Sequence, residues 1–274
     1  MPLPTPSFAN KFAEPEGLGK PRSLMLIGPE GTHKTTMAGE LIKRPDTKKI
    51  LWIDADNGTN ALAADPDIWA AVKDQRIQIM PFNTLDPNSF GEVTQILQEV
   101  ASTDYGYTYT ILDTFSVIQS SAEKFLIANT FNSSGVQDTR AGYGQVADWT
   151  LTMARLLHNS PFTTPVYILH ERLEESDTGR VKTKPKLAGG ARDSIATIPD
   201  IVVNLSFEEK MDGGTELVGH IGESVDRVGK NRYRLPTKIH EFSLNELYDV
   251  IDSKLDGSFF TTQPTTDIPA AVAA

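Results

Sequence analysis

The chain has 274 residues and no cysteine, 39% of its residues are hydrophobic, and its formal net charge is −10. This length suits one α/β domain with short appendages, and the absence of cysteine excludes disulfides and thiolate metal sites, as is usual in a reducing cytoplasm. No apolar run approaches the roughly 18 residues that a membrane helix needs, and the first ten residues lack the pattern of a secretory signal. We therefore expect a cytoplasmic protein without a membrane partner. The acidic balance argues against indiscriminate nucleic-acid binding, so any such binding would need a local basic patch.

Composition divides the chain into three parts. Residues 1–22 are rich in proline and glycine and predict an irregular lead-in, whereas residues 261–274 are rich in threonine, proline and alanine and predict a disordered tail. Residues 23–260 alternate short apolar runs with helical patterns, and we expect them to form the folded core.

Six short apolar runs in this core predict β-strands. In chain order they are Ser23–Ile27, Lys49–Ile53, Arg76–Met80, Tyr109–Leu112, Pro165–Leu169 and Ile201–Leu205.

Helical patterns separate most of these runs. They cover Met37–Ile42, Phe90–Val100, Val146–Leu157 and Leu244–Ile251. Ser89 with Glu92, and Ser243 with Glu246, have the spacing of helix-capping boxes. Strands separated by helices predict an α/β fold, with a mostly parallel central sheet and helices on both faces.

A glycine-rich segment, Gly28–Thr36 (GPEGTHKTT), follows the first predicted strand and precedes the first predicted helix. That is the context of a phosphate-binding loop, in which glycine lets backbone N–H groups form an anion cradle and the helix N-terminus adds positive potential. We therefore predict that ATP is bound by the nine residues Gly28, Pro29, Glu30, Gly31, Thr32, His33, Lys34, Thr35 and Thr36.

Three side chains have the chemistry needed around such a loop. Lys34 would reach the β- and γ-phosphates, and the Thr35 hydroxyl would hold Mg²⁺. Asp113 ends the fourth predicted strand, where an acid at the carboxyl end of a parallel strand can hold the water shell of the same Mg²⁺. His33 stands where the pattern GxxxxGK[ST] has its last glycine, and a left-handed backbone there would cost about 1–2 kcal/mol.

Several short segments resemble bacterial RecA in their residues and in their order along the chain. Gly28–Glu30 and Lys34–Thr36 match its loop GPESSGKTT, Ile53–Asp56 resembles IDAE, and Leu112–Thr114 resembles VDS. Gly189–Ala191 resembles part of the TGGxALKF stretch that closes the second DNA-binding loop of that family.

The resemblance spans about residues 23–240 and implies a RecA-like P-loop NTPase fold. A compact core of this kind is similar to the RecA-like, Sak-type ATPases of tailed phages, which work with single-strand-annealing and recombination functions. A phage-encoded protein of this type would act in the host bacterial cytoplasm.

The same resemblance assigns catalytic roles beside that of Lys34. Asp56 holds the position of the glutamate that polarises the attacking water, although its side chain is one methylene shorter. His170 ends the fifth strand, where family members place a sensor of the γ-phosphate, and Trp69 is a candidate for stacking on adenine. The alternatives are an Asp56 that caps its own loop, a His170 satisfied in the core, and a Trp69 that serves only packing.

Lys230 and Arg232 are candidates for completing the site across a subunit interface. Lys230–Arg232 (KNR) resembles the KNK segment that contacts ATP in trans in RecA, and residues i and i+2 of an extended segment project to the same side. This implies a homo-oligomer, either a ring or a filament, with ATP at the interfaces. The alternative is an exposed basic edge strand that discourages aggregation.

Residues 171–192 form a long polar stretch that predicts a structureless connection. Its cations suit a phosphodiester backbone, and a second predicted loop, 129–143, offers Tyr143 as a platform for a base. The candidate DNA-binding residues are Arg140, Tyr143, Arg180, Lys182, Lys184, Lys186 and Arg192. The alternative is a solvated surface loop, which Glu171, Glu174 and Glu175 favour.

We thus expect a slow ATPase that uses ATP and Mg²⁺, binds single-stranded DNA and is stimulated by it, with an annealing or single-strand-binding protein as a possible partner. Two alternatives stay open: a nucleotide-controlled assembly switch with little hydrolysis, and a RecA-fold ATPase that does not bind DNA.

Overall fold

The computed structural model of the chain describes residues 22–86, 88–175 and 179–255. Apart from Arg22, the predicted lead-in (1–22) lies outside the described residues, and so does the predicted tail (261–274). None of the helices among the described residues has the length and apolar character needed to span a bilayer.

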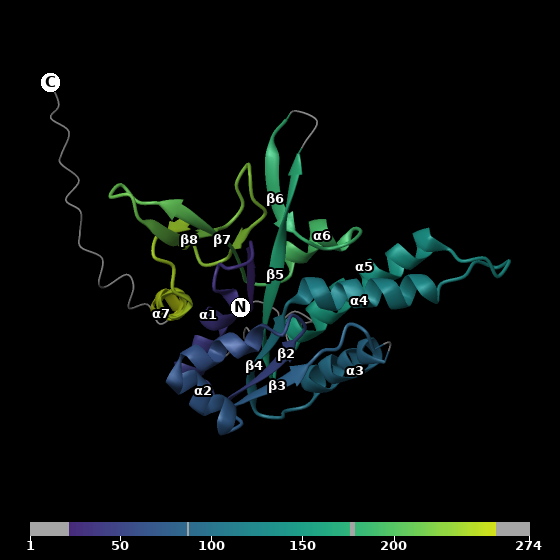
Figure 1. Ribbon diagram of the computed structural model, residues 1–274, viewed down its shortest axis with the longest axis horizontal. Coiled ribbons are helices and arrows are strands. Elements are labelled where there is room, and N and C mark those ends of the chain that lie inside the picture. The colour runs from purple at the N-terminus through teal and green to yellow at the C-terminus, as the bar shows by residue number, and fades with distance from the viewer. Residues whose placement is uncertain (1–21, 87, 176–178, 256–274) are drawn as a thin grey trace, which may run out of the picture.

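The molecule is organised around one sheet whose central strand, β1 (Leu24–Gly28), is buried along its whole length. β1 pairs in parallel with β5 (Thr164–Glu175) on one side and with β7 (Ile201–Glu209) on the other. The strand order is β10-β8-β7-β1-β5-β4-β2-β3 (Figure 1). The remaining strands are β2 (Lys49–Asp54), β3 (Ile77–Pro81), β4 (Tyr107–Asp113), β6 (Val181–Pro185), β8 (Thr215–Ile221), β9 (Lys230–Asn231) and β10 (Lys238–Ile239).

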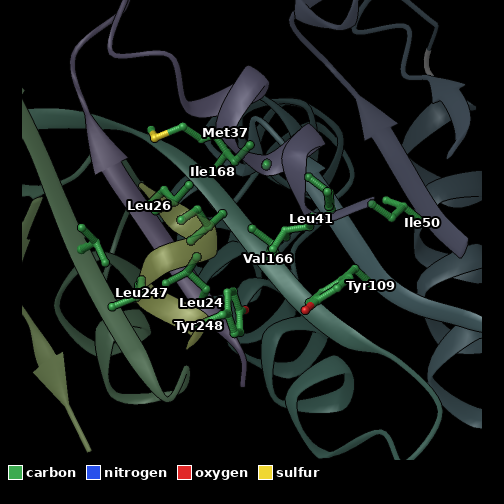
Figure 2. Packing of buried hydrophobic residues seen from close by; sticks show 14 of the residues in the cluster. Leu24, Leu26, Met37, Leu41, Ile50, Tyr109, Val166, Ile168, Leu247 and Tyr248 are labelled. Atoms are coloured by element: carbon green, nitrogen blue, oxygen red, sulfur yellow. The ribbon is translucent and has the colours of Figure 1, made fainter. Parts of the chain in front are cut away.

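Side chains of β1 alternate between two hydrophobic clusters, one on each face of the sheet. Leu24 and Leu26 point into the first cluster, and Met25 and Ile27 point into the second. The first cluster, shown in Figure 2, is covered by α1 (Lys34–Glu40), α2 (Pro66–Lys73) and α7 (Leu244–Leu255). The second is covered by α3 (Ser89–Ser102), α4 (Phe115–Ala128), α5 (Thr139–Asn159) and the 3₁₀ helix Ile195–Thr197, which directly follows α6 (Ala191–Ser194). The predicted α/β architecture, a mostly parallel sheet with helices on both faces, is therefore confirmed.

The prediction of a structureless connection over residues 171–192 is wrong. β5 continues to Glu175 and pairs with β6 in an antiparallel hairpin, which stands clear of the sheet in Figure 1. Opposite charges meet across it, because Glu174 of β5 faces Lys182 of β6 and also lies 2.9 Å from Lys184 of β6. Opposite charges on facing strands stabilise the pairing, so a polar segment folds here without an apolar pattern.

Arg140 and Tyr143 do not lie in a loop, as predicted, but in the first turns of α5. The helix begins early because the Asp138 carboxylate caps it, accepting a hydrogen bond from the Ala141 N–H at 2.9 Å. The capping box predicted at Ser89 is also wrong, since Ser89 is already helical and its helix has no side-chain cap. At α7 the Ser243 hydroxyl does receive the Glu246 N–H, at 3.5 Å.

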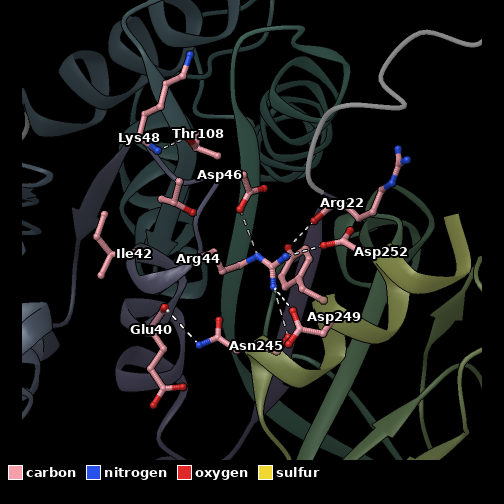
Figure 3. A network of polar contacts seen from close by, with 12 residues as sticks. Arg22, Glu40, Ile42, Arg44, Asp46, Lys48, Thr108, Asn245, Asp249 and Asp252 are labelled. Carbon is pink, nitrogen blue, oxygen red and sulfur yellow. Dashed lines mark hydrogen bonds and ion pairs between the residues drawn. The ribbon is translucent and has the colours of Figure 1, made fainter. Parts of the chain in front are cut away.

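An arginine holds α7 against the rest of the first face. The Arg44 side chain is only 8% exposed and lies between Asp249, at 3.0 Å, and Asp252, at 2.6 Å, both on α7 (Figure 3). Its guanidinium also lies 5.1 Å from the centre of the Tyr248 ring, also on α7. Asp46 provides a third carboxylate at 3.6 Å.

Candidate functional site

The carboxyl ends of the parallel strands meet at one edge of the sheet, called here the carboxyl edge. Gly28, where β1 ends, lies beside His170 of β5, and the preceding Ile27 lies beside Asn204 of β7. Asp54, where β2 ends, pairs with Asp113 of β4. Open α/β sheets bind ligands at this edge, so these positions define the candidate site.

The glycine-rich loop between β1 and α1 has the backbone that an anion cradle needs. Gly31 and His33 both have positive φ, 81° and 57°. His33 therefore adopts the left-handed conformation considered from the sequence, and its exposed ring meets Phe207 edge-on with a centroid separation of 6.2 Å. A side chain at Gly28 would place its Cβ 2.9 Å from the Leu205 carbonyl oxygen, so the close approach of β7 requires glycine there.

Lys34 is buried at the start of α1 and turns back over the loop. Its Nζ donates to the carbonyl oxygens of Gly28, at 2.9 Å, and of Pro29, at 2.6 Å. Burial lowers the pKa of Lys34, while the charges of nearby carboxylates, Asp113 foremost, oppose that shift. Lys34 Nζ also donates to the Thr32 hydroxyl at 3.2 Å, and a cation held by such neutral oxygens can exchange them for phosphate oxygens.

Thr35 and Asp113 form the oxygen pair predicted for Mg²⁺. The Thr35 hydroxyl donates to Asp113 Oδ2 at 2.8 Å. Burial raises the pKa of Asp113 to about 6, with the charges of Asp54 and Asp56 adding to the shift and the Thr35 hydrogen bond opposing it. A second cation would relieve this crowding of negative charge. Hydroxyl and carboxylate oxygens are the donors that Mg²⁺ prefers, and it commonly takes one or two from the protein and the rest from phosphates and water. The residues present therefore fit the ion.

Asp56 and His170, named separately from the sequence, are in contact. Asp56 Oδ2 lies 3.1 Å from His170 Nε2 and accepts the Thr114 hydroxyl at 2.6 Å. Burial opposes ionisation of Asp56, but these two hydrogen bonds outweigh it, so the pKa of Asp56 is lowered and the carboxylate is ionised at neutral pH. His170 Nδ1 is buried and has no hydrogen-bond partner among the described residues.

Asp54, in contrast, acts on its own loop. Its carboxylate accepts the N–H groups of Gly58, at 3.1 Å, and Thr59, at 3.3 Å, and also the Thr59 hydroxyl. These bonds fix the turn that follows β2 and bring Gly58 against Thr35, where a Cβ on Gly58 would lie 3.4 Å from the Thr35 hydroxyl. Asp56, by contrast, lies close enough to Lys34 for the charge of Lys34 to add to the lowering of the Asp56 pKa.

Two residues at the carboxyl edge were missed from the sequence. Glu171 was counted as surface charge, yet it is half-buried, and burial raises its pKa while the charges of Lys34 and Arg227 oppose that shift. The pairing of Gly28 with His170 places Glu171 one residue beyond the loop's start. Phe207, 49% exposed beside His33, was also missed. Finding Glu171 or Phe207 would have required knowing how β1 pairs with β5 and β7, and a single sequence does not supply that pairing.

The remaining candidates, Trp69 for adenine stacking and Lys230 and Arg232 for catalysis, lie on elements other than the glycine-rich loop and the strand ends beside it. Trp69 lies on α2, which packs against β3 and the two 3₁₀ helices Leu41–Lys43 and Gly58–Ala64. Lys230 pairs with the beginning of β7 at the opposite edge and donates to the Thr197 and Ile198 carbonyls. Arg232 lies 2.8 Å from Asp200 there. Within one subunit, neither cation faces the loop that holds Lys34.

A cavity of about 420 Å³ lies beside His170 and collects part of the predicted DNA-binding set. Lys186, Arg192 and Tyr143 line it, whereas Lys182 and Lys184 lie on β6 and pair with acids. Arg180 is exposed near the end of the hairpin, and Arg140 is exposed on α5 outside the cavity. The full lining comprises Ser116, Val117, Gln119, Ser120, Glu123, Tyr143, His170, Arg172, Lys186, Leu187, Ala188, Gly189 and Arg192.

Solved structures similar to this chain include the RadB recombinase, with 14% identity over 81% of this chain and 87% of that one and a TM-score of 0.49. Two type III secretion ATPases are also similar over 68% of this chain. A prototypical ATPase from pathogenic bacteria has 11% identity, 52% of its own length covered and a TM-score of 0.41. EscN of enteropathogenic E. coli, solved with its central stalk EscO, has 13% identity, 42% of its own length covered and a TM-score of 0.43. No curated protein sequence matches the chain.

A family model described as an AAA domain matches residues 20–233, which include the glycine-rich loop, Asp113 and the cavity beside His170. The match covers most of the chain, and it supports the prediction of a P-loop ATPase that binds a nucleotide. The chain belongs to the AAA domain family.

Proposed function

We propose that this protein is an ATPase that binds Mg²⁺–ATP at the carboxyl edge and hydrolyses it in response to single-stranded DNA bound in the adjoining cavity. The observation that carries the proposal is the position of His170. Its ring contacts Asp56, and its carbonyl oxygen accepts the N–H of Lys186 at 2.8 Å, so one residue connects the nucleotide site with the cavity.

Each residue of the nucleotide site has a task in this proposal. Lys34 leaves the carbonyls of Gly28 and Pro29 and pairs with the β- and γ-phosphates. Thr35 and Asp113 would hold Mg²⁺, which would supply positive charge beside the phosphates. Asp56, ionised and oriented by Thr114 and His170, accepts the proton of the attacking water.

The cavity offers the chemistry of a single-strand site. Lys186 is exposed and forms no ion pair with the described residues, so its charge is available to a phosphate. Tyr143 is 40% exposed and presents a ring on which a base can stack. A chain of net charge −10 concentrates cations here, which favours a specific role over general surface charge.

The biological setting that fits these properties is recombination, annealing or replication of the kind served by phage RecA-like proteins. Such a protein would work with single-stranded DNA and with an annealing or single-strand-binding partner. The position of Lys230 and Arg232, at the edge opposite the loop, is consistent with a ring or filament in which they reach a neighbour's ATP.

A second function is favoured by the geometry of Asp56. Its side chain is short and is already tied to Thr114 and His170, which would slow proton transfer and leave a nucleotide-controlled switch of assembly. Nucleotide binding with no release of phosphate would identify the switch. An ATPase whose turnover and binding ignore DNA would instead be the third possibility.

The nucleotide half of the proposal is tested by Lys34→Ala. Loss of the largest cation in the loop should abolish detectable binding of fluorescent ATP while the circular dichroism spectrum stays that of the parent. If the variant binds Mg²⁺–ATP as tightly as the parent, the glycine-rich loop is not the nucleotide-binding site.

The DNA half is tested with a labelled oligothymidylate and ATP at several salt concentrations. Lys186→Ala should weaken binding and reduce the log–log salt slope by about 0.7, the share of one single-strand phosphate contact. Lys49→Ala removes an exposed cation at the opposite edge and is the matched control. Equal effects of the two substitutions, or no binding by the parent, would refute DNA binding in the cavity.

A further inference from the structure

Three cations from three elements converge on one carboxylate beside the cavity. Glu174 of β5 accepts Lys184 of β6 at 2.9 Å and Arg192 of α6 at 2.5 Å, and the Nε of Arg172 lies 3.7 Å away. We call Arg172, Lys184 and Arg192 the cation cluster. Hydrogen bonding from Lys184 lowers the pKa of Glu174, and the charges of Arg192 and Arg172 add to the shift, so the carboxylate is ionised.

The cation cluster has more positive charge and more hydrogen-bond donors than Glu174 neutralises or accepts. Arg192 Nε is buried without a hydrogen-bond partner among the described residues. Asp193 supplies only one further carboxylate, at 2.8 Å from Lys184. With the exposed Lys186 and with Glu123, which also lines the cavity, four cations are matched by three carboxylates, which leaves a net positive site in an acidic protein.

The cluster is continuous with the cavity, because Arg172 and Arg192 also line it. In Figure 1 the hairpin and α6 lie next to each other, and the two elements that bear Lys184 and Arg192 are in contact. A phosphate at the cluster would therefore be followed along a strand by nucleotides at Lys186 and Tyr143.

A phosphodiester can take the place of the Glu174 carboxylate. Both groups are monoanions with two unesterified oxygens, and the planar guanidinium of arginine binds either of them through parallel N–H donors. Glu174 is 23% exposed, so it can turn into solvent without crossing the core. The three cations are already collected, which reduces the ordering that the incoming anion would have to impose.

We propose that the cation cluster is a phosphate subsite for single-stranded DNA, and that Glu174 occupies it as an internal competitor until a DNA phosphate displaces it. This inference rests on the proposed DNA binding, and it adds the subsite and the residue that restrains it. The competitor sets a threshold, since weak anions do not displace it whereas a strand that also engages Lys186 and Tyr143 does.

The test compares Glu174→Gln with Glu175→Gln for binding of labelled oligothymidylate. The two changes alter net charge equally, but successive strand residues face opposite sides of the hairpin. Glu174→Gln should tighten binding by roughly five- to tenfold, the scale of a few exposed ion pairs, and Glu175→Gln should change it by less than about twofold. Adding Arg192→Ala to Glu174→Gln should remove the gain, which a purely structural role of Glu174 does not predict.

The outcomes separate this inference from the function on which it rests. If the parent binds through Lys186 but Glu174→Gln binds no tighter than Glu175→Gln, the competitor is refuted and DNA binding stands. Weaker binding by a Glu174→Gln protein that keeps its melting temperature would also refute it. If the parent and all variants fail to bind, both proposals fall.

Discussion

His33 and Asp56 are the residues at which the site departs from the RecA pattern, and the structure gives each a distinct consequence. His33 takes the left-handed backbone that its position requires, so the loop keeps its shape with a residue that tolerates this conformation better than most. Asp56 has a shorter side chain than glutamate, and two hydrogen bonds, to Thr114 and His170, fix its orientation. The sequence predicted the candidates, but the contact between Asp56 and His170 depends on strand order.

Asp56→Asn should leave ATP affinity within a few-fold of the parent and reduce phosphate release by roughly 10²-fold or more, the usual scale for a lost general base. The amide keeps the shape of the carboxylate but accepts no proton. Glu92→Gln, on the exposed side of α3, makes the same charge change away from the site and should have no effect. If Asp56→Asn releases phosphate as fast as the parent, another acid is the general base, and the half-buried Glu171 is the next residue to substitute.

Asp113 makes the stability of the metal-free protein depend on pH. Its folded pKa of about 6 lies above the ordinary value of 3.8, so the folded state binds a proton that the unfolded chain releases. This contribution is complete below about pH 4 and is lost as the pH rises through about 6. In EDTA, Asp113→Asn should flatten this part of the profile and raise the free energy of unfolding at about pH 8 by roughly 1–3 kcal/mol. Urea titrations across pH measure it; a variant with the parent's slope would show that the pKa of Asp113 is not raised in the folded protein.

At the scale of elements, strands and helices could be predicted from the sequence where apolar residues recur regularly, but not where the segment is mostly polar. All six predicted strands exist, and most are displaced or extended by only a few residues. β6 was not predicted because its residues, Val181–Pro185, are mostly polar and are held by pairing with β5. β8 and the two short strands β9 and β10 were missed for the same reason, since their stability comes from neighbours distant in the chain. No helix was predicted at α4, although Phe115 and Ile118 are fully buried.

Arg44 should hold α7 on the first face of the sheet. Arg44→Met removes the charge from beneath three carboxylates and should lower the free energy of unfolding by about 1.5–3 kcal/mol, the range for hydrogen bonds to charged groups. Arg44→Lys should recover only part of this loss because an ammonium lacks the planar fork. Lys43→Met removes the neighbouring cation from its more exposed pair with Asp65 and should cost less than about 1 kcal/mol. Equal losses in Arg44→Met and Lys43→Met, by urea unfolding, would contradict this role.

At the scale of the whole molecule, the two edges of the sheet separate the nucleotide loop from Lys230 and Arg232. The loop follows the end of β1, whereas β9 pairs with the beginning of β7. The sequence predicted that these cations act in trans, and their placement within the subunit leaves that prediction to be tested. Their present partners, Thr197 and Ile198 carbonyls and Asp200, would have to be exchanged for phosphate at an interface.

Mixing two inactive variants tests action across the interface. A Lys34→Ala subunit has a defective loop and intact cations, and a Lys230→Ala/Arg232→Ala subunit has the reverse. Each should be nearly inactive alone, because a cation supplied in trans can raise turnover by about 10³–10⁵. The mixture should regain phosphate release in proportion to the interfaces that join an intact loop to intact cations. A mixture that co-assembles, as shown by cross-linking, yet stays inactive would contradict the prediction.

The central claim is that the nucleotide site and the cavity beside His170 work together, and phosphate release with and without single-stranded DNA tests it most directly. Release should be slow in the protein alone and should rise about tenfold or more with saturating oligothymidylate, a factor within the usual range of coupling between two sites. The rise should be lost in Lys186→Ala while the basal rate persists. Equal release with and without DNA, measured under conditions in which the DNA is bound, would contradict the account.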